Sequence, residues 1–195
     1  MSEQQFDKRR RRFLFRIFKP KNMRNISKPL PNEYPDYSKI YMDLVNVDGD
    51  ILKFMKQNLS KIKAFIYSLP KEKLTYRYAP NKWTIKEILV HLIDDERIYT
   101  YRALRWARND QTELPGFEQD DYVPFSNANE RSLESIFSEY ESVRNSTISL
   151  FENLPEKALM RRGITEGHSR TVRAMIYHLA GHELNHMKVI RERYI

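Results

Sequence analysis

YHLAGHELNH, at residues 177–186, is the stretch that decides how this chain folds and where its chemistry lies. Three of the protein's five histidines, His178, His182 and His186, stand in it at intervals of four residues. Residues four apart lie on one face of an α-helix, with their Cβ atoms about 5 to 6 Å apart. Two imidazoles spaced in this way can point at the same metal ion. We therefore predict a last helix over residues 169–195, opened by Ser169 or Thr171, that carries a metal site.

The segment His182–His186 also matches the pattern H-E-x-x-H, in which metalloproteases place two zinc ligands and a glutamate base. A protease of this kind needs a third ligand after the motif, and the nine residues that follow His186 contain no histidine. No alternation typical of a strand predicts the sheet edge on which such proteases align their substrates. A zincin-like peptidase with Glu183 as its base is therefore a minor hypothesis.

Three further helices are predicted upstream, because apolar residues recur at intervals of three and four over residues 50–69, 84–109 and 132–153. Thr84 and Glu87 form a capping box at the start of the second, and Ser132 caps the third. The connection over residues 110–130 is long for a compact bundle. The chain is therefore predicted to be an all-α protein, a four-helix bundle with a long crossover between helices 2 and 3.

An internal repeat supports this layout. The pattern T-[IV]-x-x-[IM]-[LI]-x-H-L occurs at residues 84–92 and again at residues 171–179, and Glu96 has its counterpart in Glu183. We interpret the repeat as two helical hairpins in a pseudo-twofold arrangement. Because no H-E-x-x-H surrounds Glu96, the repeat favours a shared packing or hydrogen-bonding role for the two glutamates.

The second and fourth predicted helices can complete a metal site. If they face each other across the core, His91 approaches the pair formed by His182 and His186. Three neutral imidazoles with an open position are the ligand set of a catalytic zinc site, and imidazole also suits nickel, copper or iron. We expect zinc or nickel. Glu183 is expected at the edge of the site, since it lies about 100° around the helix from His182.

Two other residues are candidates for the lining of the site. Asp95 lies one turn after His91 on the same helical face, and it is either a fourth ligand or a carboxylate that orients a histidine. His178 shares the face of His182 and is expected to flank the site without being a ligand. His168 falls in a glycine-containing turn and is expected to be exposed. No catalytic residue is predicted beyond the metal ligands.

Composition narrows the function further. The chain has no cysteine, which excludes disulfides and thiolate metal sites. Its net charge of +8 arises within residues 1–30, which hold ten Lys/Arg and two Asp/Glu, whereas the other 24 basic and 24 acidic residues balance. The folded domain therefore has no signature for nucleic acid. No apolar run approaches the roughly 20 residues that span a bilayer, so a cytoplasmic location is expected.

The basic residues predict an N-terminal arm. We place it at residues 1–38, interrupted by prolines, and the folded domain at residues 39–195. The arm is expected to be flexible and dispensable for folding to about residue 35, although a basic run beside aromatic residues can contact anionic surfaces.

Three segments resemble the DinB-like family of damage-inducible proteins. They are WTIKEILxHLxDxE at residues 83–96, LPGF at residues 114–117 with Asp121-Tyr122, and GHExxHxxxIRERY at residues 181–194. The resemblance covers about residues 42–195. It implies a four-helix bundle with a long crossover, often a homodimer, whose three-histidine metal site falls at His91, His182 and His186. Relatives with this fold include S-transferases that use the thiols bacillithiol or mycothiol, and a maleylpyruvate isomerase.

These observations favour a divalent-metal-dependent enzyme that acts on a small-molecule substrate. We expect a thiol S-transferase, with a low-molecular-weight thiol as cofactor, or a hydrolase. A non-catalytic, stress-related metal-binding bundle is the first alternative, and the zincin-like peptidase is the second.

Overall fold

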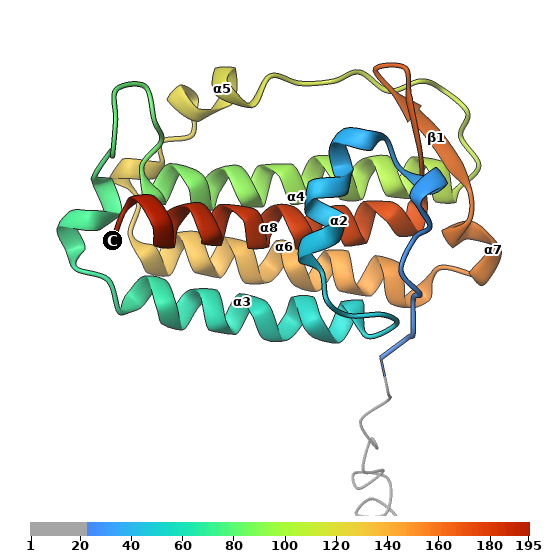
Figure 1. Cartoon of the computed structure of the whole chain (residues 1–195), viewed down its shortest axis with the longest axis horizontal. Helices are drawn as coiled ribbons and strands as arrows, with labels where there is room; N and C mark the ends of the chain where they lie inside the picture. The colour runs from blue at the N-terminus through green and yellow to red at the C-terminus, as the bar shows by residue number, and fades with distance from the viewer. Residues whose placement is uncertain (1–22) are drawn as a thin grey trace, which may run out of the picture.

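Four long helices form the body of the protein. The computed structural model describes residues 23–195 and contains α3 (Ile51–Tyr67), α4 (Ile85–Ala107), α6 (Leu133–Asn153) and α8 (Val172–Arg193), packed as a bundle (Figure 1). The predicted all-α four-helix bundle is confirmed. Three of the helices begin at the predicted caps, because the side chains of Thr84, Ser132 and Thr171 each accept a hydrogen bond from the amide three residues on.

The order of the helices in space differs from the predicted hairpins. Helices α3 and α4 each pack against both α6 and α8. The two helices of each predicted hairpin, α3 with α4 and α6 with α8, therefore lie diagonally across the bundle. The crossover over residues 108–132 returns along the length of the bundle before α6 begins, and it includes the short helix α5 (Gln119–Tyr122) (Figure 1). This diagonal order places α4 directly beside α8.

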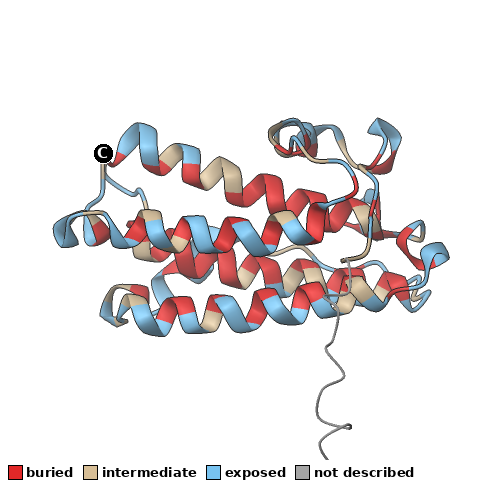
Figure 2. Cartoon of the chain, turned by 90° about the horizontal axis from the view of Figure 1, so that it is seen from below, coloured by how far each residue is buried: buried red, intermediate tan, exposed pale blue. Residues whose placement is uncertain are grey.

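The core lies where the inner faces of the long helices meet. In α3 and α6 buried positions follow one side and exposed positions the other, whereas the N-terminal halves of α4 and α8 are buried on nearly all sides (Figure 2). The largest fully buried side chains include Trp106, Tyr140, Tyr177, Phe137 and Phe151. Among residues 23–195, none of the helices combines the length and the apolar character that crossing a membrane would take.

A short hairpin precedes the last helix. Strands β1 (Arg162–Thr165) and β2 (His168–Thr171) pair antiparallel, after the short helix α7 (Glu156–Leu159). Of the two residues predicted to open the last helix, Thr171 is the N-cap, whereas Ser169 lies within β2. Strands of four residues are too short to show an alternating pattern in the sequence.

A further helix, α2 (Lys39–Leu44), crosses α8 and was not predicted. Gly181 permits this crossing, because a Cβ atom at that position would lie 2.1 Å from the carbonyl oxygen of Tyr41. The close approach brings the Tyr41 ring edge-on to the rings of His178 and His182, at centroid distances of 4.8 and 5.4 Å. Gly181 thus allows α2 to form one wall beside the histidines.

Residues 23–38 belong to the folded domain, which corrects the expected arm of residues 1–38. Ile26 is buried, and its amide donates to the Gly49 carbonyl at 2.9 Å. Glu33, which is also buried, accepts hydrogen bonds from Thr171 at 2.9 Å and from the Nε atom of Arg173 at 2.7 Å. Single anchors of this kind produce no periodic pattern in a sequence, which is why the segment was assigned to the arm. The rest of the expected arm, residues 1–22, lies outside the described residues.

Truncation tests this boundary. We expect a chain that starts at Lys39 to have a free energy of unfolding about 3 kcal/mol or more below that of a chain that starts at Met23, since it loses the buried Ile26 and the hydrogen bonds of Glu33. Urea denaturation followed by circular dichroism measures the difference. Coincident transitions for the two chains would show that residues 23–38 are dispensable for folding.

Candidate metal centre

The adjacent helices α4 and α8 bring three histidine side chains together. The Nε2 atom of His182 lies 3.3 Å from Nε2 of His91 and 2.9 Å from Nε2 of His186. One ring nitrogen from each of the three lies within 4.8 Å of the other two. Nitrogens bound to a tetrahedral zinc at 2.0–2.1 Å lie roughly 3.3 Å apart, so the three histidines fit a single ion. Their proximity is a feature of the structure, and metal binding stays a prediction.

Burial keeps His91 and His186 in the neutral form that binds metals. Burial and the neighbouring His182 lower the pKa of His91 to about 4, and the same two causes lower the pKa of His186 well below its ordinary value. Both rings are therefore neutral at pH 7, with lone pairs available to a cation. The indole of Trp83 covers the site, stacked on His186 at an interplanar angle of 13° and 4.7 Å from the ring centre of His91.

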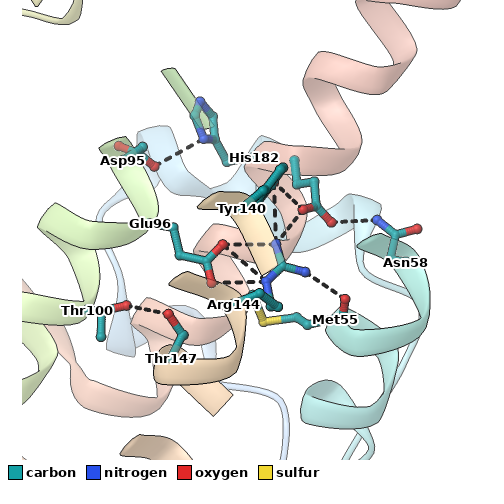
Figure 3. Close-up of polar contacts among 10 residues, drawn as sticks. Met55, Asn58, Asp95, Glu96, Thr100, Tyr140, Arg144, Thr147 and His182 are labelled. Atoms are coloured by element: carbon teal, nitrogen blue, oxygen red, sulfur yellow. Dashed lines mark hydrogen bonds and ion pairs between the residues drawn. The ribbon is translucent and has the colours of Figure 1, made fainter. Parts of the chain in front are cut away.

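Asp95 contacts the opposite side of the His182 ring. Its Oδ2 atom lies 3.1 Å from Nδ1 of His182 (Figure 3). Burial acts to raise the pKa of Asp95, but the contact with His182, together with the neighbouring His178 and His91, outweighs it and holds that pKa below its ordinary value. The carboxylate favours a proton on Nδ1, which leaves the lone pair of Nε2 facing the other two histidines. Of the two predicted roles for Asp95, the geometry favours the orienting one.

Replacing Asp95 with asparagine is expected to weaken metal binding about 10- to 100-fold, because an amide holds the His182 ring and its tautomer less firmly than a carboxylate. Competition with a chromophoric chelator measures the affinity. Asp94→Asn is the matched control, since Asp94 is the neighbouring carboxylate and pairs with Arg97 at 3.6 Å. Equal affinities for the two variants would remove Asp95 from the site.

His178 lies beside the group of three histidines and is not a member of it. Its Nδ1 atom is 3.2 Å from the Ser38 hydroxyl, and its ring stacks on Tyr99 with centroids 4.6 Å apart. Burial lowers the pKa of His178 to about 3. It therefore forms an uncharged wall one turn from His182. His168 is exposed on β2.

Glu183 is engaged in a buried network away from the three histidine nitrogens. Its carboxylate accepts hydrogen bonds from Asn58 at 2.6 Å and from Tyr140 and Arg144 at 2.5 Å each. Arg144 also donates to Glu96 at 3.0 Å, so one guanidinium joins the two glutamates of the internal repeat (Figure 3). This arrangement leaves Glu183 unavailable as the base of a zincin-like peptidase.

Two cavities reach the histidine group, one at His182 and the other at His186. One of about 180 Å³ is lined by His182 and Asp95 and also by Arg102 and Arg170. The other, of about 230 Å³, is lined by His186 together with aromatic side chains. The aromatic residues are Trp83, Tyr78 and Tyr194.

Sequence reasoning missed the two arginines and gave no role to Trp83. The sequence could have indicated Arg102, since it follows Asp95 by seven residues and so lies on the same helical face. No sequence pattern indicates Arg170, because only the hairpin places it at the cavity.

Comparison with known proteins agrees with this geometry. The family model described as the DinB superfamily matches residues 55–190. A protein from Oceanobacillus iheyensis named "Putative metal-dependent hydrolase OB0413" is 26% identical over 147 residues, which cover 73% of this chain and 84% of that protein. A solved structure of YfiT from Bacillus subtilis, described as "a probable metal-dependent hydrolase with an unusual four-helix bundle topology", matches with a TM-score of 0.60 at 13% identity. That match covers 85% of this chain and 92% of YfiT, and it shows a shared fold.

Proposed function

This chain belongs to the DinB superfamily, and we propose that it is a divalent-metal-dependent hydrolase of a small molecule. The observation that carries the proposal is the convergence of His91, His182 and His186 in a mostly buried site that opens to two cavities. The printed name of the Oceanobacillus relative supports the same class of activity. A divalent ion held by these histidines, zinc or nickel, would polarise a substrate oxygen and lower the pKa of a bound water.

The surrounding residues orient His182 and shield the histidines from bulk water. Asp95 holds the proton of His182 on Nδ1 and so directs Nε2 into the site. Trp83 and Tyr41 cover two sides of the histidine group, which limits the access of bulk water. The substrate enters through the cavities, where it contacts His182 from one side or His186 from the other.

Transfer of a small thiol to an electrophile is the second candidate. Two separate cavities favour it, because a transferase binds two reactants at one centre whereas a hydrolase needs one reactant besides water. A metal lowers the pKa of a bound thiol as it does that of water. The peptidase alternative has no support, since the carboxylate of Glu183 is engaged by Asn58, Tyr140 and Arg144.

The test uses full-length protein purified without a histidine tag or a metal column. Its metal content is measured first, and the protein is then assayed on small esters, amides and phosphoesters, and on low-molecular-weight thiols with electrophiles. We expect turnover that is lost after chelation and restored by zinc or nickel. Bound metal without turnover in either set would favour the non-catalytic bundle. The homodimer, the cytoplasmic location and the contact of the arm with anionic surfaces stay predictions.

A further inference from the structure

Two buried arginines line the cavity beside His182, and neither forms an ion pair with a carboxylate. Arg102 and Arg170 are 5% and 2% exposed. Among residues 23–195, the ion pairs of buried arginines join carboxylates to Arg144, and none joins a carboxylate to Arg102 or Arg170. Arg170 contacts the hydroxyl groups of Tyr37 and Tyr99, and its Nε atom is buried without a hydrogen-bond partner.

The two guanidinium groups face the same space. Their central carbons lie 5.4 Å (Arg102) and 5.8 Å (Arg170) from the centre of the Tyr99 ring. Both side chains line the cavity that His182 and Asp95 also line. Two cations are therefore held beside the metal site, and burial together with the neighbouring Arg170 lowers the pKa of Arg102.

The LPGF segment of the crossover holds one of these arginines in place. The Pro115 carbonyl accepts a hydrogen bond from Arg102 at 2.8 Å, and the Phe117 ring lies 5.6 Å from its guanidinium. The amide of Leu114 donates to the Ile164 carbonyl at 3.0 Å, which joins the crossover to β1. Segments far apart in the sequence thus close a cavity around two positive charges.

Two acidic residues, Asp95 and Glu166, also line the cavity and their charges act on Arg102, but neither forms an ion pair with an arginine there. Asp95 faces Nδ1 of His182 at 3.1 Å. Glu166 is exposed in the hairpin turn, with its carboxylate against Gly116. Removing a guanidinium from water without an ion-pair partner is costly, and two like charges side by side add to that cost. A bound anion would offset this cost by pairing with both guanidinium groups.

We propose that Arg102 and Arg170 form a subsite for an oxyanion, a carboxylate or a phosphate group of the small molecule on which the metal site acts. The planar fork of a guanidinium matches either group through paired hydrogen bonds. The subsite lies at the His182 side of the centre, so it orients a substrate whose reactive bond reaches the three histidines. The link to a substrate rests on the proposed function, whereas binding of the anion does not.

The test measures anion binding in full-length protein freed of metal by chelation. Inorganic phosphate or acetate is titrated at constant ionic strength, with chloride as the compensating salt, and the thermal midpoint is followed. The cavity variants are Arg102→Met and Arg170→Met. Arg108→Met is the control, because it removes an equal charge from an exposed position just after α4.

We expect phosphate or acetate to raise the midpoint of the wild type and of Arg108→Met, with apparent affinity at least tenfold weaker in both cavity variants. The anion with the larger effect identifies the group. Without added anion, the cavity variants should melt at or above the wild-type midpoint, because each loses a buried charge that forms no ion pair with a carboxylate. A residue with a purely structural role would lower it. Should either methionine variant fail to fold, Arg102→Lys and Arg170→Lys are measured, and they too should bind more weakly.

Equal anion effects in the wild type and the cavity variants, or no effect in the wild type, would overturn the subsite. Metal content, measured on untreated portions of the same preparations, separates this inference from the proposed function. Metal binding without an anion effect rejects the subsite alone. An anion effect in a protein that takes up no metal supports the subsite and rejects the metal-dependent enzyme.

Discussion

The double variant His182→Ala, His186→Ala is expected to contain no divalent ion, against about one per chain in the wild type. The variant keeps only His91 of the three converging histidines, and one imidazole does not hold a divalent ion through purification. The wild type should also gain stability from added metal, by about 2.7 kcal/mol at a free concentration of 100 times Kd. The variant should gain nothing.

Elemental analysis of tag-free protein measures the metal, and thermal unfolding with and without zinc or nickel measures the stabilisation. His168→Ala is the matched control, because His168 is exposed on β2 and takes no part in the group of three histidines. It should keep the full metal content. Circular dichroism of the metal-free proteins shows whether the double variant still folds. Equal metal contents in the wild type and a folded double variant would reject the site.

The helices of this protein were predictable because their information is local. Apolar residues at intervals of three and four define the buried faces, and caps such as Thr84 and Ser132 mark the starts within a residue of their observed positions. The order of the helices in space was not predictable in the same way. Whether α4 lies beside α8 or across from it depends on how whole faces fit together, and no single stretch of sequence records that.

The candidate site likewise has a part that the sequence predicts and a part that depends on tertiary packing. The spacing of His182 and His186 follows from one helix, so the sequence was enough to pair them. The addition of His91 needed the assumption that α4 and α8 are neighbours, and the structure supplies it. Arg102 and Arg170 come from a helix and a hairpin that meet at the cavity through the crossover. No periodic pattern connects residues that only tertiary packing brings together.

The internal repeat predicted a shared role for two glutamates but not the residue that they contact. It indicated that Glu96 and Glu183 share a hydrogen-bonding role, and both contact the guanidinium of Arg144. The repeat contained no sign of the partner, because Arg144 lies on α6, outside both copies. The result is a buried ion-pair network at the middle of the bundle, with Arg144 only 2% exposed.

Loss of Arg144 is expected to destabilise the protein severely. Arg144→Met should lower the free energy of unfolding by about 3–5 kcal/mol at pH 7, because it leaves the buried carboxylates of Glu96 and Glu183 without their cation. Urea denaturation measures the loss. Arg108→Met is the control at an exposed position and should change stability by less than about 0.5 kcal/mol. A variant as stable as the wild type would show that the network contributes nothing to folding.

The pH dependence distinguishes this mechanism from a simple loss of packing. Burial already raises the pKa of Glu96 above its ordinary value of 4.5, even with Arg144 present. Without the guanidinium that pKa rises further, so the folded variant binds a proton that the unfolded chain releases above pH 4.5. The free energy of unfolding of Arg144→Met should therefore fall further below that of the wild type as the pH rises from about 4.5 to 7, and the two should approach each other in acid. A packing defect would give a difference that does not change with pH.

Glu183→Gln should keep its metal, because the network that engages Glu183 lies apart from the histidine nitrogens. Peptidase activity that vanished in this variant with metal retained would instead make Glu183 a catalytic base.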